Sequence, residues 1–491
     1  MKFGEFPKLA SFGSVAAFRA HLAALQLPMP CDDIVASGSN SVFAAPIEVA
    51  GMKIGNRLAL NPMEGWDGEP DGRPSENTIR RWRRFGTSGG KLVWGGEAVA
   101  VRPDGRANPN QLVMSGTTQP AIARLREALV EAHREAMGSD EGLVVGLQLT
   151  HSGRFCKPND HKKFEPFIAY RHPLLDRKFG YPEDRPVMSD DEIRRLVDDF
   201  VRAAKRAQDA GFDFVDIKHC HGYLAHEFLS GHTRQGPYGG SLENRTRFLR
   251  EVVAGVRAQA PGLGIGVRLS VADVVPFRPD PAQSKPGALG PGIPEDFSSL
   301  LPYVYGFGVD PQNPTEIDLA EPFALFEILR GLDIRFVNVT LASPYYNPHV
   351  TRPALYPPSD GYLPPEDPLV GVMRHLYTVG CLKEAYPDFC LMGSGYTYLQ
   401  EFLPNVAQAV LRLNWTDFVG LGRMLLAYPE LPRDLLEGKP VQKKRLCRTF
   451  SDCTTAPRNG LVSGCYPLDA HYKKSEEFKR LAALKKPAKT G

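Results

Sequence analysis

At residues 212–224 the chain reads FDFVDIKHCHGYL, an apolar run that turns abruptly polar. Its first half is typical of a buried strand, and its second half gathers Lys218, His221 and Tyr223 at the carboxyl end of that strand. In a parallel α/β barrel this end carries functional groups, because the strand fixes the backbone and the following loop opens to solvent. The alternative to a functional site is a structural loop whose histidines only form hydrogen bonds with backbone groups. The segments on either side favour a functional site.

Strand-like and helix-like segments alternate outward from this stretch. Ser189 and Glu192 form a capping box that opens an amphipathic helix, and Gly211 ends it. Further strands are expected at residues 57–63, 91–95, 142–149, 264–269, 336–340, 389–392 and 418–421, with helices at 76–86, 120–136, 242–259, 321–331 and 370–385. This alternation predicts an α/β protein with one closed (β/α)8 TIM barrel. No Gly-x-Gly-x-x-Gly follows a strand, so a separate dinucleotide-binding domain is not predicted.

Three regions are expected along the chain: an N-terminal extension (1–42), the barrel (43–445) and a C-terminal extension (446–491). Residues 43–56 are predicted to form a hairpin that caps the bottom of the barrel. A Pro/Gly-rich insertion from Ser270 to Leu319 separates the fifth and sixth strands, and such long loops are usually lids or binding loops. The basic tail from Lys473 to Gly491 is expected to be a solvated helix with a frayed end.

Bulk composition excludes several classes of function. The 491 residues carry a net charge of only +3, without the clustered lysines and arginines that nucleic-acid binding requires. No apolar run of signal-peptide or membrane-spanning length occurs, which predicts a soluble, cytoplasmic protein that binds no membrane. The eight cysteines are few for this length and mostly scattered, as in proteins of a reducing compartment.

A series of short motifs identifies a possible family. In order they are Asn56-Arg57, Asn61-Pro62-Met63, Glu97-Ala98, Gly105-Arg106, QLTHSGR (148–154), His221-Gly222-Tyr223-Leu224, YGGSLENR (238–245), Val267-Arg268-Leu269-Ser270, Gly393-Ser394-Gly395 and Val419-Gly420-Leu421-Gly422-Arg423. Together, over about residues 43 to 470, they resemble the Old Yellow Enzyme family of FMN-dependent NAD(P)H:flavin oxidoreductases and ene-reductases. The resemblance implies a TIM barrel, FMN as cofactor, NADH or NADPH as co-substrate, and reduction of an activated C=C bond in a small substrate. It also implies that homo-oligomers can form.

The resemblance assigns a cofactor site that agrees with the chemistry of each position. Arg268 would stabilise negative charge on the reduced ring, since an arginine within an apolar strand needs an anionic partner. Gln148 offers a donor and an acceptor to the pyrimidine edge. The phosphate would be held near the last two strands, where glycine lets the backbone approach closely. The implied cofactor-binding residues are Pro62, Met63, Glu64, Ala98, Gln148, Arg268, Gly393, Ser394, Gly395, Gly422 and Arg423.

The resemblance also assigns catalytic roles. His221 would donate a hydrogen bond to a substrate oxygen, and Tyr223 would protonate the carbon opposite to hydride attack. Relatives carry a histidine where this chain has Lys218, whereas His219 is offset by one residue and should point elsewhere. A lysine there favours an anionic substrate or, with a depressed pKa, acts as a base. The alternative is a purely structural role, in which Lys218 forms an ion pair with Glu64 or Glu97.

Other pocket positions also depart from the family. Glu64 stands where relatives have threonine or cysteine near the flavin, and Trp66 stands where tyrosine is frequent. The aromatic segment after the sixth strand and the Ser270–Leu319 insertion are expected to line the substrate pocket. The implied substrate-binding residues are Trp66, Lys218, His221, Tyr345, Tyr346 and His349. A surface loop packed by its own tyrosines is the alternative for residues 342–349.

Three C-terminal cysteines raise the question of a metal. Relatives that resemble dienoyl-CoA reductases and trimethylamine dehydrogenase bind a [4Fe–4S] cluster through four cysteines, and only the spacing from Cys453 to Cys465 matches here, with Cys447 out of register. We therefore expect no metal, with a cluster completed by another residue as the alternative. For the whole chain, two other functions stay open: a flavin dehydrogenase or bond-cleaving oxidoreductase of the trimethylamine-dehydrogenase type, and a flavin- or ligand-binding barrel without turnover.

Overall fold

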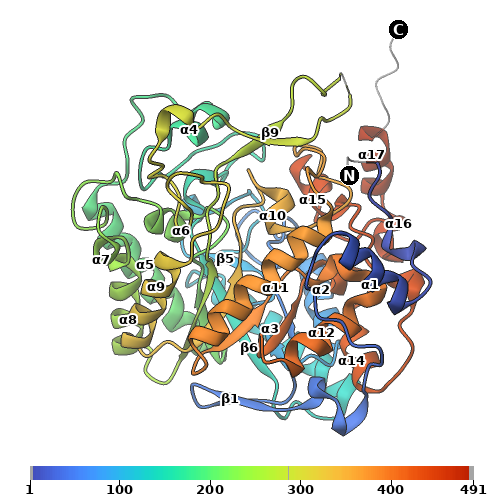
Figure 1. The fold of residues 1–491 in the computed structure, drawn as a ribbon. Helices are drawn as coiled ribbons and strands as arrows, with labels where there is room; N and C mark the ends of the chain where they lie inside the picture. The colour runs from blue at the N-terminus through green and yellow to red at the C-terminus, as the bar shows by residue number, and fades with distance from the viewer. Residues whose placement is uncertain (1–3, 286, 486–491) are drawn as a thin grey trace.

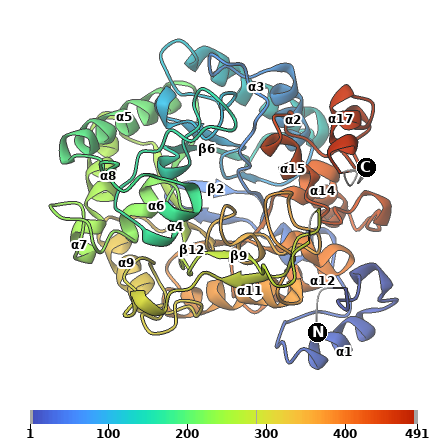
Figure 2. The same cartoon turned by 90° about the horizontal axis from the view of Figure 1, so that it is seen from above.

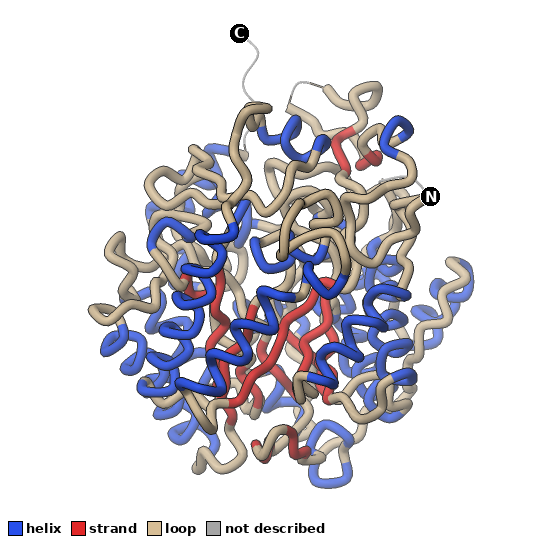
Figure 3. The backbone as a smooth tube through the Cα atoms, turned by 90° about the vertical axis from the view of Figure 1, so that its left-hand side faces the viewer, coloured by secondary structure: helices blue, strands red, loops and turns tan. Residues whose placement is uncertain are grey.

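The computed structural model describes residues 4–285 and 287–485. Its centre is a closed barrel of parallel strands, viewed from the side in Figure 1 and Figure 3 and from above in Figure 2. Each strand pairs with the next, and β13 returns to β3, which confirms the predicted TIM barrel. The barrel strands are β3 (Leu58–Leu60), β4 (Leu92–Val93), β6 (Val144–Thr150), β7 (Phe214–Ile217), β8 (Gly264–Ser270), β11 (Phe336–Thr340), β12 (Cys390–Gly393) and β13 (Phe418–Leu421).

Helices cover the outside of the barrel (Figure 2). They are α2 (Glu76–Gly86), α3 (Gln119–Met137), α5 (Asp190–Asp209), α8 (Arg247–Gln259), α9 (Ala320–Gly331), α11 (Pro368–Ala385) and α12 (Leu403–Arg412), with the shorter α13 (Arg423–Ala427) and α14 (Leu431–Leu436) after the last strand. The predicted helix 242–259 is broken at Thr246 into α7 (Leu242–Arg245) and α8, where the Thr246 hydroxyl donates back to the carbonyl of Leu242 at 2.8 Å. Short helices α4 (Pro173–Phe179), α6 (Leu224–Leu229) and α10 (Pro348–Thr351) lie in the loops.

One strand that pairs with the barrel, β5 (Ala98–Ala100), was not predicted. The chain leaves β4 through Gly95 and Gly96, both with positive φ, and then resumes as β5, which pairs with β6. A Cβ on Gly96 would lie 2.4 Å from the ring of Trp82, so only glycine fits this bend. The bend brings Glu97 inward beneath the barrel mouth, where it is fully buried.

The predicted hairpin closes the bottom of the barrel. Its strands β1 (Ile47–Val49) and β2 (Met52–Ile54) pair antiparallel and lie at the base in Figure 1. Val49 and Ile54 pack into a cluster with Trp94, Phe214 and other inward-facing barrel residues. Because this end is filled with apolar side chains, the opposite, carboxyl end of the strands is where a binding site can open.

The insertion from Ser270 to Leu319 does not line the pocket, which corrects our expectation. It forms a ribbon of β9 (Phe277–Pro279) and β10 (Gly292–Pro294) that lies beside the loop carrying α4. The hydroxyl of Tyr170 donates to the carbonyl of Tyr305 at 3.0 Å, and Lys178 Nζ donates to the carbonyl of Phe277 at 3.0 Å. These contacts direct the insertion outward, against the rim of the barrel.

Both terminal segments pack on the barrel. In the N-terminal extension, α1 (Val15–Ala24) contacts the 3-10 helix η7 (Tyr396–Phe402) that precedes α12, and the Phe18 and Phe402 rings stack at 4.2 Å. The C-terminal extension runs over the barrel mouth through α15 (Asp452–Arg458) and continues to α16 (Ala470–Lys473) and α17 (Glu476–Leu484). The last part of the predicted basic tail, residues 486–491, lies outside the described residues. Among the residues that are described, no helix combines the length and apolar character that crossing a membrane requires.

Candidate active site

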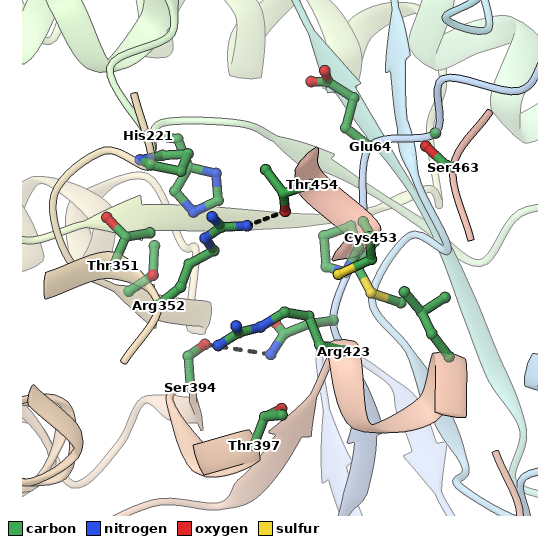
Figure 4. Close-up of a pocket in the computed structure, with 18 of the residues that line it drawn as sticks. Glu64, His221, Thr351, Arg352, Ser394, Thr397, Arg423, Cys453, Thr454 and Ser463 are labelled. Atoms are coloured by element: carbon green, nitrogen blue, oxygen red, sulfur yellow. Dashed lines mark hydrogen bonds between the residues drawn. The ribbon is translucent and has the colours of Figure 1, made fainter. Parts of the chain in front are cut away.

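A cavity of about 250 Å³ opens at the carboxyl end of the strands. It collects side chains from the loops after β3, β7 and β11, from the ends of β8, β12 and β13, and from the C-terminal extension (Figure 4). Most of the residues expected from the sequence line it: Pro62, Met63, Glu64, Trp66, Gln148, Lys218, His221, Tyr223, Arg268, Tyr345, Ser394, Gly395, Gly422 and Arg423.

Four expected residues do not line the cavity. Ala98 is buried in β5, where its carbonyl accepts from Gln111 Nε2 at 3.0 Å, and Gly393 ends β12 with its N–H bonded to Thr416 Oγ1 at 3.0 Å. Tyr346 turns away because its hydroxyl donates to Asp273 at 2.6 Å, and His349 contacts the hydroxyl of Tyr362 at 2.7 Å. The aromatic segment therefore contributes Tyr345 and Pro344 to the cavity, and its next side chains pack into the rim.

The end of β7 presents Lys218 and His221 to the cavity. His219 faces the opposite side, with its ring 6.4 Å from that of Phe248 on α8. His221 has a left-handed backbone (φ 67°), held because its N–H donates to Ser270 Oγ at 3.0 Å and its carbonyl accepts from Ser343 Oγ at 2.7 Å. Burial, with the positive charges of Arg268 and Lys218, lowers the pKa of His221 well below its usual range. The imidazole is therefore neutral at physiological pH.

Glu64 is the centre of a polar cluster on the cavity wall. The hydroxyl of Tyr223 donates to Glu64 Oε2, and Trp66 Nε1 donates to Glu64 Oε1 at 3.2 Å. Lys218 Nζ lies 3.9 Å from Glu64 Oε2 and 3.6 Å from the centre of the Tyr223 ring. The structure thus pairs Lys218 with Glu64. Glu97, the other carboxylate considered, is bound by Arg81 at 2.6 Å.

This cluster sets the protonation of its members. Burial and the Glu64 carboxylate raise the pKa of Tyr223 well above its usual range, so the phenol keeps its proton. Burial lowers the pKa of Lys218, whereas the Glu64 carboxylate opposes that change. A second phenol, Tyr345, has its hydroxyl 2.9 Å from that of Tyr223. The wall therefore offers a protonated phenol next to a lysine.

Arg268 and Gln148 are positioned by one carboxylate at the floor of the cavity. Asp216 Oδ1 accepts from the backbone N–H of Arg268 at 2.6 Å, and its Oδ2 accepts from Gln148 Nε2 at 2.5 Å. Burial raises the pKa of Asp216 to about 6, although these hydrogen bonds oppose the rise. Arg268 Nη1 donates to the carbonyl of Pro62 at 3.2 Å, and its buried Nε has no hydrogen-bond partner among the described residues.

The other end of the cavity is cationic. Gly395 has a φ of 94°, and a Cβ there would lie 3.0 Å from the ring of His375, so glycine is required. Ser394 Oγ accepts from Asn61 Nδ2 at 3.4 Å. Arg423 Nη2 donates to the carbonyl of Pro353 at 3.1 Å, but its buried Nη1 finds no partner in the described part of the chain. Glycine backbone and an incompletely bonded guanidinium together suit an anion.

Sequence reasoning missed several lining residues, namely Arg352, Thr351, Thr397, Cys453, Thr454, Arg458 and Ser463. Most come from the C-terminal extension, for which the sequence predicts only a degenerate cysteine motif and a basic tail. It is attached to the site by specific bonds: Ser463 Oγ accepts from the N–H of Trp66 at 2.8 Å, and Arg352 donates to Thr454 Oγ1. The three C-terminal cysteines gather along a small neighbouring cavity beside Arg423. Within residues 4–285 and 287–485, no group of three His, Cys, Asp or Glu side chains is arranged to hold a metal ion.

Comparison with known proteins gives consistent matches. The family model described as NADH:flavin oxidoreductase / NADH oxidase family matches residues 41–283. An NADPH dehydrogenase of Bacillus subtilis (strain 168) is 34% identical over 234 residues, which are 46% of this chain and 63% of that protein. A 12-oxophytodienoate reductase 1 of Oryza sativa subsp. japonica is 29% identical over 283 residues, which are 57% of this chain and 70% of that protein.

Solved structures extend the similarity in fold beyond these residues. A 2-naphthoyl-CoA reductase, solved as a complex with 2-naphthoyl-CoA, superposes with a TM-score of 0.61 at 18% identity, covering 89% of this chain and 58% of that chain. A morphinone reductase superposes with a TM-score of 0.53 at 21% identity, covering 82% of this chain and 91% of that chain. At such identities the likeness establishes the fold alone. In sequence, the chain spans 63% and 65% of the length of the first two NADPH dehydrogenases that it matches.

Proposed function

Because the chain belongs to the NADH:flavin oxidoreductase / NADH oxidase family, we propose that it is an FMN-dependent oxidoreductase that uses NADH or NADPH to reduce an activated C=C bond of a small organic substrate. The observation that carries the proposal is the cavity at the barrel mouth. It combines an incompletely bonded Arg268 on the floor, a cationic end at Arg423, and a wall with His221 and Tyr223.

The residues present fit FMN. Buried guanidinium nitrogens of Arg268 and Arg423 lack partners in the described structure, and each such group costs about 1–3 kcal/mol unless a ligand satisfies it. Arg423 with Ser394 and Gly395 would bind the phosphate, Gln148 the pyrimidine edge, and Arg268 the side of the ring that becomes negative on reduction. Bound FMN would supply the hydride acceptor and donor.

The wall residues would act on the substrate. A neutral His221 donates a hydrogen bond to a carbonyl or similar oxygen, which draws electron density from the double bond. The Tyr223 phenol, which keeps its proton because of burial and Glu64, delivers that proton to the carbon that develops negative charge. His221 therefore polarises the substrate and Tyr223 protonates it.

Lys218 would select substrates that carry an anionic group. We predict that Lys218→His raises the KM for a carboxylate-bearing enone about tenfold, since one charge-assisted hydrogen bond is lost, and changes the KM for a neutral enone by less than about twofold. Steady-state kinetics with the matched pair of substrates measures this. Lys157→Met is the control, because Lys157 lies over the Phe164 ring at 4.1 Å and is not part of the cavity lining. If Lys218→His changes the KM for both substrates equally, Lys218 does not select anionic substrates.

One contact favours a second function. The Tyr223 hydroxyl points at a carboxylate, an arrangement that also suits proton removal from a substrate. A flavin dehydrogenase that oxidises its substrate and does not consume NAD(P)H is therefore the other candidate. A barrel that binds flavin without turnover would show no change of the flavin spectrum with either nicotinamide or substrate.

The absorption spectrum of the purified protein tests the proposal. We predict oxidised-flavin bands that bleach within seconds when NADH or NADPH is added without oxygen, in a preparation that contains no iron. Bands that bleach only with an oxidisable substrate would favour the dehydrogenase. A colourless protein that takes up no added FMN would contradict the proposal. Iron in stoichiometric amount would support the alternative of a cluster at Cys447, Cys453 and Cys465.

Two broader inferences accompany the proposal. We infer that the barrel is residues 43–445, with residues 1–42 and 446–491 as extensions that pack against it. We also infer a cytoplasmic location, supported by the eight cysteines, which are all unpaired in the structure.

A further inference from the structure

Two arginines from different loops line the same cavity: in Figure 4 the Arg352 side chain extends towards Thr454 and that of Arg423 lies near Ser394. Arg423 begins α13, and Arg352 follows α10 in the loop after β11. Their segments are in contact, because Arg423 Nη2 donates to the carbonyl of Pro353, the residue next to Arg352, at 3.1 Å. Both side chains line the cavity, beside Ser394 and Gly395.

Neither arginine has a carboxylate partner in the described part of the chain. Two buried arginines elsewhere are each paired with two carboxylates: Arg81 binds Asp67 and Glu97, and Arg154 binds Asp176 and Glu227. By contrast, Arg352 donates through Nη1 to the hydroxyl of Thr454 and leaves its buried Nε without a partner, as Arg423 leaves Nη1.

The charges of the two groups oppose each other. Burial, followed by repulsion from Arg423 and Arg458, lowers the pKa of Arg352 to about 9. Two cations that share a cavity without a counterion are unfavourable, and a dianion placed between them removes the repulsion and satisfies the open N–H groups. A phosphate monoester carries nearly two negative charges at neutral pH and has several acceptor oxygens.

We propose that Arg352 and Arg423 form one phosphate site, in which Arg352 is a second arginine that holds the 5′-phosphate of FMN. This inference rests on the proposed function. The family motifs place Arg423 at the phosphate but say nothing of Arg352, whose loop carries none of them. The site would be completed from the C-terminal extension, because Thr454 at the start of α15 is the side chain that positions Arg352.

The anionic group that binds Arg352 could also belong to the substrate. Arg352 lies near enough to His221 to contribute to its lowered pKa, so an anionic group on a substrate could also reach it. The two sources differ in a measurable way. If Arg352 binds the cofactor phosphate, it discriminates FMN from riboflavin, which has the same ring and ribityl chain but no phosphate.

The test is flavin binding to protein freed of its cofactor, followed by quenching of flavin fluorescence. We expect Arg352→Met to weaken FMN binding at least about tenfold and to leave riboflavin binding within about twofold of wild type. Thr454→Val should weaken FMN binding by a smaller factor in the same direction. Arg374→Met is the matched control: this arginine of α11 is paired with Glu366 and does not line the cavity, so FMN affinity should not change.

Each other outcome overturns the inference in a recognisable way. If Arg352→Met binds FMN as tightly as wild type, Arg352 does not hold the phosphate. If only the KM for an anionic substrate rises, Arg352 belongs to the substrate site. If the wild-type protein binds neither flavin, the proposed function fails, and this inference fails with it. Circular dichroism and thermal midpoints of the variants show whether each is folded, and inorganic phosphate should raise the midpoint of the cofactor-free wild type more than that of Arg352→Met.

Discussion

Replacement of Tyr223 by phenylalanine is expected to slow transfer from the reduced flavin to an enone by about 10²–10⁴-fold, the usual contribution of a positioned acid. The Tyr223 phenol holds the proton that is to be transferred. Its hydroxyl donates to Glu64 and lies 2.9 Å from the hydroxyl of Tyr345. Reduction of the flavin by NADPH requires no proton from Tyr223, so that half-reaction should keep its rate. Stopped-flow absorbance of the flavin measures the two half-reactions separately.

Tyr345→Phe is the control for this prediction. It removes a neighbouring hydroxyl from the same wall and leaves the Tyr223–Glu64 bond in place, so we expect a change below about fivefold. Glu64→Gln keeps a hydrogen-bonding side chain at that position but removes the negative charge that raises the pKa of Tyr223. Equal slowing of both half-reactions in Tyr223→Phe would mean that Tyr223 only supports the shape of the cavity.

The sequence predicted the barrel and the end of β7 for a physical reason. Alternation along an apolar strand fixes which side chains face inward, so Lys218 and His219 separate to opposite faces without any knowledge of tertiary structure. Residues on the loop after such a strand follow within a few positions, which is why His221 and Tyr223 were located as well. Local rules are sufficient where the strand itself positions the group.

The errors arose where contacts between distant segments decide the position. Arg352 and Thr454 are 102 residues apart, and no local pattern connects them. The aromatic segment after β11 has no periodicity that would assign Tyr345 and Tyr346 to opposite sides. Their separation depends on the hydrogen bond that the Tyr346 hydroxyl donates to the distant Asp273. Likewise, the Pro/Gly content of the Ser270–Leu319 insertion indicates a long loop but not the side of the rim on which it packs.

Arg81→Met is expected to destabilise the protein by about 3–5 kcal/mol, because it leaves buried carboxylates without their cation. The guanidinium of Arg81, on α2, binds Asp67 and, at 2.6 Å, Glu97, and both carboxylates are almost completely buried. Urea unfolding followed by circular dichroism measures the change. Arg83→Met on the same helix is the control: its side chain is 44% exposed and pairs only with surface glutamates, so we expect a change below about 0.5 kcal/mol.

The pH dependence of Arg81→Met separates a loss of charge pairing from a loss of packing. Burial raises the pKa of Glu97 to about 7, while Arg81 opposes that rise, so removing Arg81 raises the pKa further. A carboxyl whose pKa is higher in the folded than in the unfolded state binds its proton more tightly when folded, so stability increases as the pH falls from the folded pKa towards the unfolded value. The variant should therefore recover part of its loss, relative to wild type, as the pH falls from the variant's own higher Glu97 pKa to about 7, below which both proteins gain stability in parallel. A deficit that stays constant across this range would mean that Arg81 acts mainly through its packing against the Gly65 loop, where a Cβ on Gly65 would lie 2.5 Å from Arg81 Nη2.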